Sequence, residues 1–241
     1  VTPGGGRTEA SPEEPVDPGP PDDSTGAFVR NTAVMSVGTA LSRLTGFLRL
    51  AALTYALGVT ESRLADAYNI ANITPNILYE LALGGILTSV VVPVVVEWLQ
   101  EHGRDAAWDV VRRLFKLALV VLSAIAVLGI VLAPWIVDLY TSGVPESQKA
   151  ATAALATFFL RWFMPQVVFY GLGAVATGLL NAHRRFAAPM FAPIVNNLVV
   201  IATFAIFAAM PGPAPGSNDL ATDAQRLVLA IGTTLGVVGM T

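Results

Sequence analysis

Two arginines, Arg43 and Arg49, stand in the stretch SRLTGFLR inside an otherwise apolar region. A charge at the centre of a membrane-spanning helix costs roughly 2.5–3.5 kcal/mol, so it persists where it faces a cavity or a partner. A planar guanidinium captures phosphate or carboxylate through paired hydrogen bonds. The pair therefore indicates binding of an anionic head group, and a bend at Gly46 would turn both side chains toward one cavity. The alternative is that one or both extend to the membrane interface.

A polar stripe on the next apolar segment, residues 66–98, favours the cavity. At 100° per residue its members fall within about 120° of arc. They are Asp66, Asn69, Asn72, Asn76 and Glu80. Such a stripe does not face lipid, and Pro75 and the Gly84-Gly85 pair would break the helix, which is tolerated where backbone lines a cavity. The alternative is a stripe that only holds helices together.

A third arginine, Arg161, lies in the apolar run RWFMPQVVFYGLG. It either lines the same cavity or sits at the outer interface beside Trp162. The Asn196-Asn197 pair farther along is more typical of helix–helix contact than of ligand binding. We therefore predict a cationic cavity with the three arginines on its walls. The two acids of the stripe, Asp66 and Glu80, would pair with them or hold them apart when the cavity is empty, and Asn76 would contact the ligand.

The sequence contains no motif for chemistry on a substrate. There is no nucleophile–base pair and no phosphate-binding loop, so we expect a protein that is not an enzyme and has no cofactor. Cysteine is absent, and His102 and His183 are isolated, so no metal site is expected. No basic excess points to nucleic acid.

The composition is that of a membrane protein. Hydrophobic residues make up 54% of the 241 residues and charged residues 13%, with a mean hydropathy of +0.63. Soluble domains carry about 25% charged residues. Residues 1–26, rich in Pro, Gly and acids, lack the large apolar residues that would offset the entropy of ordering, so we predict a disordered tail. A soluble all-α enzyme would need more charged surface.

Beyond the tail, residues 27–241 form six long apolar runs, each enough for a span of about 20 residues. They lie near 31–57, 66–98, 114–140, 150–180, 186–210 and 225–241. The predicted fold class is therefore all-α, a polytopic membrane helix bundle of about six transmembrane helices. Seven bases on one side of the spans against three on the other predict a cytoplasmic N-terminus. The last run ends without a polar flank, so we expect the chain to be truncated.

Two stretches carry a family resemblance. SRLTGFLR with DAYNIANITPNILYELALGGILTSVVVPVV resembles the opening of the MurJ/MviN lipid II flippases, and GLLNAHRRFAAPMFAPIVNN resembles that family's junction of fourth and fifth helices. The resemblance covers about residues 28–210. It implies the first lobe of a two-lobed transporter in the cytoplasmic membrane, which moves the undecaprenyl-pyrophosphate-linked peptidoglycan precursor, lipid II, outward. Family arginines match Arg43, Arg49 and Arg161, and a family aspartate matches Asp66.

One position departs from the family pattern. Many members carry an arginine pair after the Pro-Asn of the second helix, where this chain has Tyr79 and Glu80. We therefore expect a different completion of the pyrophosphate site or a different substrate contact. The resemblance further implies membrane lipids and cell-wall synthesis proteins as partners, and the composition fits an actinobacterial member. The alternatives are an exporter of another polyprenyl-linked saccharide or small molecule, and a membrane subunit without transport.

Overall fold

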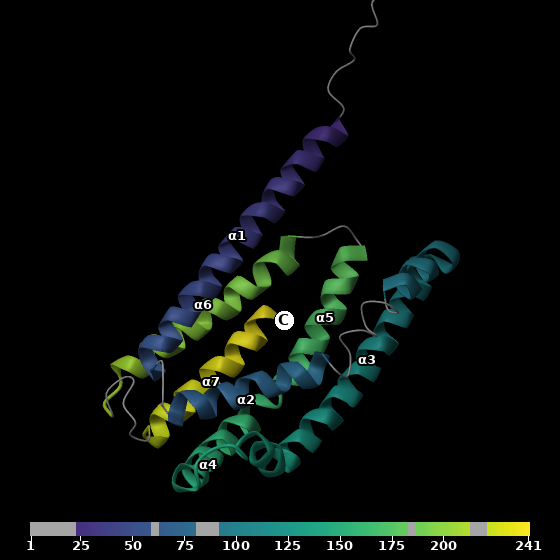
Figure 1. Ribbon diagram of the computed structural model, residues 1–241. Coiled ribbons are helices and arrows are strands. Elements are labelled where there is room, and N and C mark those ends of the chain that lie inside the picture. Colours follow the sequence, from purple (N-terminus) through teal and green to yellow (C-terminus); the bar gives the residue numbers. More distant parts are fainter. Residues whose placement is uncertain (1–22, 59–62, 81–91, 183–186, 213–220) are drawn as a thin grey trace, which may run out of the picture.

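The computed structural model describes residues 23–58, 63–80, 92–182, 187–212 and 221–241, which form helices and their connections with no strand among them (Figure 1). The all-α prediction is confirmed for this part of the chain. The helices are α1 (Asp23–Leu57), α2 (Arg63–Tyr79), α3 (Val92–Tyr140), α4 (Glu146–Phe163), α5 (Gln166–Ala182), α6 (Ala187–Ala209) and α7 (Asp223–Met240).

Helix α1 is one continuous rod of 35 residues that carries both arginines of the opening motif. It runs unbroken through Gly46, where we expected a bend (Figure 1). The helix ends where Gly58 adopts φ 95° and its N–H donates to the Thr54 carbonyl over 3.0 Å, a left-handed cap that glycine adopts without steric cost. Residues 1–22 of the predicted tail lie outside the described residues, and residues 23–26 are helical.

Helix α3 differs from the sequence prediction because it includes the polar segment around residues 100–113, which we expected to separate two spans. Its 49 residues extend about 73 Å at 1.5 Å per residue, far more than a bilayer core of about 30 Å. Only Val111–Tyr140 is apolar enough to span. Of the predicted span 66–98, residues 66–79 belong to α2 and residues 92–98 belong to α3, and residues 81–91 with both glycines lie outside the described residues.

The predicted span 150–180 is occupied by two helices, α4 and α5, with a break at Met164 and Pro165. Proline has no backbone N–H to continue the helical ladder, so the break follows from Pro165. Taken together as Lys149–Asn181, the two helices are long and apolar enough to cross a membrane, as is α6. Three segments of the described chain therefore qualify as spans by length and composition, and each overlaps one of the six predicted.

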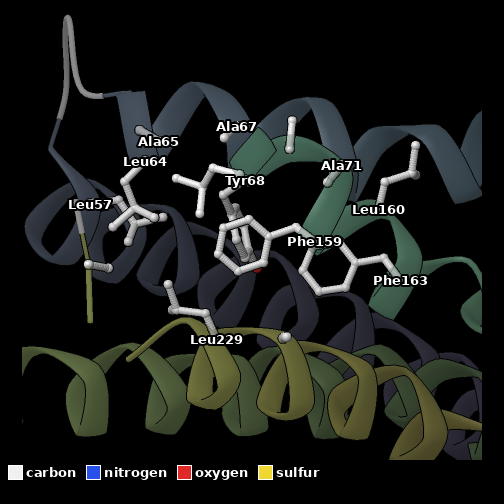
Figure 2. Packing of buried hydrophobic residues seen from close by; sticks show 14 of the residues in the cluster. Leu57, Leu64, Ala65, Ala67, Tyr68, Ala71, Phe159, Leu160, Phe163 and Leu229 are labelled. Carbon is white, nitrogen blue, oxygen red and sulfur yellow. The ribbon is translucent and has the colours of Figure 1, made fainter. Parts of the chain in front are cut away.

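The core forms where α2 packs against α4, and α6 and α7 close it from the other side. At its centre the Tyr68 ring is fully buried and meets three phenylalanine rings edge-on, at centroid distances of 5.5–5.8 Å (Figure 2). These rings belong to Phe159, Phe163 and Phe204. Two further pairings, α1 on α6 and α3 on α5, complete the bundle.

Candidate functional site

Helix α2 has a packed face and an open face, and the predicted polar stripe lies on the open one. The packed face holds Leu64, Ala65, Ala67, Tyr68, Ala71, Thr74 and Pro75. On the other side Asp66, Asn69, Asn76 and Glu80 are exposed, and Asn72 is half-buried. The other described helices therefore leave the stripe uncovered, as a cavity wall requires. Along it the Asn76 amide donates to the Glu80 carboxylate over 3.0 Å.

Arg49 is the arginine that the fold brings to α2. Its side chain is half-buried, and its guanidinium lies within electrostatic reach of the Tyr68 hydroxyl of α2 and of the Tyr170 hydroxyl of α5. The Tyr68 hydroxyl also shares a 2.9 Å hydrogen bond with Thr233 of α7. Arg49 thus reaches from α1 to a junction of α2, α5 and α7, where a charge is held by polar groups inside the bundle.

One edge of α2, beside Arg49, forms the border between its packed face and its open face. At 100° per residue, Tyr68, Asn72 and Tyr79 fall within about 40° of one another. Tyr79 packs against Tyr170, with ring centroids 6.0 Å apart and planes 35° apart. Sequence analysis singled out Tyr79 only as a departure from the family pattern and missed Tyr170 entirely, because nothing local marks a single tyrosine of an apolar helix as a neighbour of α2.

The other two candidate arginines occupy different surroundings. Arg43 is exposed, and on an unbroken α1 it points about 120° away from Arg49. Arg161 is exposed in the last turn of α4, where a positive charge also offsets the helix dipole. Within the described residues, neither Asp66 nor Glu80 forms an ion pair with any of the three arginines. Of the two expected arrangements, in which the acids either pair with the arginines or hold them apart, no pairing is present in this part of the chain, and Glu80 accepts a hydrogen bond from Asn76.

The break between α4 and α5 is bridged by α7. The Thr234 hydroxyl donates to the Trp162 carbonyl over 3.1 Å, and the Gln166 amide donates to Thr234 over 3.1 Å. The Trp162 carbonyl lies in the last turn before this break, and Thr234 supplies it with a donor. The Gln166 amide oxygen is buried without a partner among the described residues. These residues support the fold beside the site, and the Thr-Thr pair in α7 is the only local signal for them.

Asn197 of the α6 asparagine pair makes the helix–helix contact that the sequence favoured, whereas the Asn196 amide oxygen is buried without a partner among the described residues. The Asn197 amide donates over 3.1 Å to the Thr45 hydroxyl of α1, which joins the two helices. Thr45 lies between the two candidate arginines, so this contact fixes the rotation of α1 that sends Arg49 inward.

Two pockets in the described chain lie away from this site. One of about 430 Å³ separates α6 and α7 and is lined by apolar side chains such as Ile206 and Leu235. The other, of about 370 Å³, lies between α1 and α6 around Tyr55 and Phe204. Neither includes a candidate arginine. No group of three or more potential metal ligands occurs in the described part of the chain.

Comparison with known proteins gives a consistent result. The family model described as lipid II flippase MurJ matches residues 53–239, a range that begins after Arg43 and Arg49. A lipid II flippase MurJ of Burkholderia cenocepacia is 33% identical over 171 residues, covering 71% of this chain and 32% of that protein. A probable lipid II flippase MurJ of Synechocystis is 26% identical over 224 residues, covering 91% of this chain and 39% of that protein.

A solved structure has the same fold. It is that of a lipid II flippase MurJ in an inward closed conformation, which superposes with a TM-score of 0.63 at 22% identity, over 86% of this chain and 41% of that chain. The chain thus spans about a third of the length of the curated relatives it matches.

Proposed function

This chain belongs to the lipid II flippase MurJ family, and we propose that it forms the first lobe of a transporter that moves lipid II across the cytoplasmic membrane by alternating access. The remaining length of the relatives corresponds to a second lobe. Rocking of one lobe against the other would expose a central site to each side of the membrane in turn. The chain binds and moves its substrate without chemical change, so its residues act by recognition rather than catalysis.

One observation carries this proposal: the polar face of α2 is left open by its own lobe. Polar and acidic groups at membrane depth do not face lipid, because each unsatisfied group there costs several kcal/mol. The opposite face of α2 is apolar and packed, so the helix is oriented with its stripe toward a space that the lobe lines but does not fill. That is the arrangement of a helix on the wall of a central cavity between two lobes.

Within that cavity the arginines would hold the pyrophosphate. Arg49 is presented at the junction with α2 and α5, and its planar fork suits bidentate phosphate binding. Arg43 and Arg161 are exposed and free of ion pairs in the described chain, so both are available to an anionic ligand. Asp66, Asn76 and Glu80 would line the wall and accept or donate hydrogen bonds to the head group. The polyprenyl tail would stay in the bilayer.

The orientation completes the proposal. We assign the chain to the cytoplasmic membrane with a cytoplasmic N-terminus, supported by the excess of bases on one side of the spans. In the described residues this side includes Arg112, Arg113 and Lys116 at the start of the apolar part of α3, all of them exposed. Lys149 lies beyond the other end of that span.

The test replaces Arg49 by alanine and by lysine in the complete protein. A lost charge-assisted contact costs about 1.5–3 kcal/mol, so Arg49→Ala should lower affinity for lipid II about ten- to a hundredfold, with Arg49→Lys intermediate. Binding is measured in nanodiscs, with growth complementation in a strain depleted of its own flippase. Arg112→Ala is the matched control, because Arg112 forms only an exposed pair with Asp109.

The amount of protein in the membrane separates this role from a structural one. Arg49 forms no ion pair with a carboxylate in the described chain, so Arg49→Ala strands no buried acid and should leave abundance close to that of the wild type. Full complementation with unchanged lipid II affinity would contradict the pyrophosphate role. Equal affinity for a polyprenyl pyrophosphate bearing a different saccharide would instead favour the broader exporter alternative.

A further inference from the structure

Tyr79 and Tyr170 form an aromatic pair at the border of the open face of α2. Tyr79 is the last residue of α2, Tyr170 lies in the first half of α5, and their ring centroids are 6.0 Å apart. Both side chains are half-buried. Two rings in this tilted arrangement pack favourably, and the arrangement leaves part of each ring surface accessible.

The pair differs from the tyrosine in the core. Tyr68 is fully buried, its ring is enclosed by phenylalanines, and its hydroxyl is satisfied by Thr233. In the described chain, by contrast, no hydrogen bond involves the hydroxyl of Tyr79 or Tyr170. A phenylalanine would serve equally well at a position that needs only packing. Two half-buried tyrosines whose hydroxyls have no hydrogen bond in the described chain therefore indicate a surface that a polar ligand completes.

Groups of opposite character flank the rings. On one side the Glu80 carboxylate lies within electrostatic reach of the Tyr79 hydroxyl and accepts a hydrogen bond from Asn76. On the other side the Arg49 guanidinium lies within electrostatic reach of the Tyr170 hydroxyl. The two rings thus have the Glu80 carboxylate near Tyr79 and the Arg49 guanidinium, which can bind an anion, near Tyr170.

This combination has the chemistry of a saccharide site. A sugar ring presents polarised C–H groups that lie favourably on the negative face of an aromatic ring. Its hydroxyls donate to carboxylates and accept from amides, which Glu80 and Asn76 supply. A phosphate attached to the sugar would lie at the Arg49 end.

We propose that Tyr79 and Tyr170 bind the sugar ring that is attached directly to the pyrophosphate of the transported lipid. The inference rests on the proposed function, in which Arg49 holds that pyrophosphate. It also gives a role to the position where this chain departs from its family's arginine pair: at Tyr79 an aromatic contact to the saccharide replaces a second cationic contact to the phosphate.

The experiment compares two ligands on the complete protein in nanodiscs: undecaprenyl pyrophosphate without sugar, and the same carrier bearing a disaccharide. The variants are Tyr79→Leu and Tyr170→Leu, which keep apolar bulk but lose the ring face, together with the phenylalanine variants, which keep it. Tyr140→Leu, at the exposed end of α3, is the matched control. Binding is expressed per folded protein, so a change in abundance does not affect the result.

Each leucine variant should bind the disaccharide lipid about two- to tenfold more weakly and the bare pyrophosphate unchanged. The phenylalanine variants should be intermediate, because they keep the ring face and lose the hydroxyl. Equal weakening of both ligands, or weakening of neither, would overturn the saccharide role. Arg49→Ala in the same assay separates the two proposals. If it weakens both ligands while the tyrosine variants weaken neither, the saccharide role alone fails; if it weakens neither, the pyrophosphate role fails and the saccharide role falls with it.

Discussion

Replacing Tyr68 should separate the energetics of its ring from those of its hydroxyl. The ring is fully buried among three phenylalanines from α4 and α6, so Tyr68→Ala creates a large cavity and should cost about 3–5 kcal/mol of unfolding free energy. Tyr68→Phe keeps the ring and removes the 2.9 Å contact with Thr233. Hydrogen bonds between membrane helices are worth about 0.6 kcal/mol on average and up to about 1.7. We therefore expect a loss of about 1 kcal/mol for phenylalanine.

A double-mutant cycle with Thr233→Val isolates the hydrogen bond from the contact that the same hydroxyl makes with Arg49. The coupling energy should be about 0.6–1.7 kcal/mol. The assay is reversible unfolding by a denaturing detergent in mixed micelles, followed by tryptophan fluorescence. A loss below about 1 kcal/mol for Tyr68→Ala would refute the assignment of Tyr68 to the centre of the core. A coupling energy of zero would show that Thr233 and Tyr68 do not share a hydrogen bond.

Two further predictions concern packing and orientation. A Cβ at Gly232 would overlap the Thr203 side chain across the α6–α7 contact, so Gly232→Ala should lower the free energy of unfolding by about 1–3 kcal/mol in the same assay. A Cβ at Gly143 meets no atom within 4 Å, so Gly143→Ala should be neutral. Equal effects of the two substitutions would contradict the close contact. The sequence contains no cysteine, so single cysteines can be introduced as reporters of orientation. A cysteine at Ser142 should react with an impermeant thiol reagent added to intact cells, and a cysteine at His183 should not. The reverse pattern would overturn the cytoplasmic N-terminus.

The two faces of α2 could be predicted because they depend on local periodicity alone. A stripe of polar residues spaced by three and four must share one side of a helix, and the apolar residues between them must share the other. Asp66 and Asn76 are exposed and Tyr68 is buried, as that spacing requires. The break at Pro165 also has a local cause, since proline removes a backbone donor, but sequence reasoning read through it because the hydropathy stays high on both sides.

The partner of Arg49 could not be predicted in the same way. From the sequence, a buried arginine favours a carboxylate, and Asp66 and Glu80 were the nearest candidates along the chain. The contact that forms depends on how α1 is rotated, and that rotation is set by long-range packing such as the hydrogen bond from Asn197 to Thr45. The result is an arginine that lies near two tyrosine hydroxyls, a proximity that no spacing rule indicates.

This difference changes how the site would work. An arginine neutralised by a buried carboxylate must break an ion pair before it binds phosphate, and that cost would be subtracted from the affinity. Neighbouring tyrosine hydroxyls carry no negative charge, so they leave the charge of the guanidinium uncompensated and its attraction for an anion is retained. Because the acids of α2 stand on the open face instead, with Glu80 bonded to Asn76, they are free to meet the hydroxyls of a head group. If the proposed site is right, the lobe keeps its cation and its acceptors apart, and a ligand that carries both phosphate and sugar would join them.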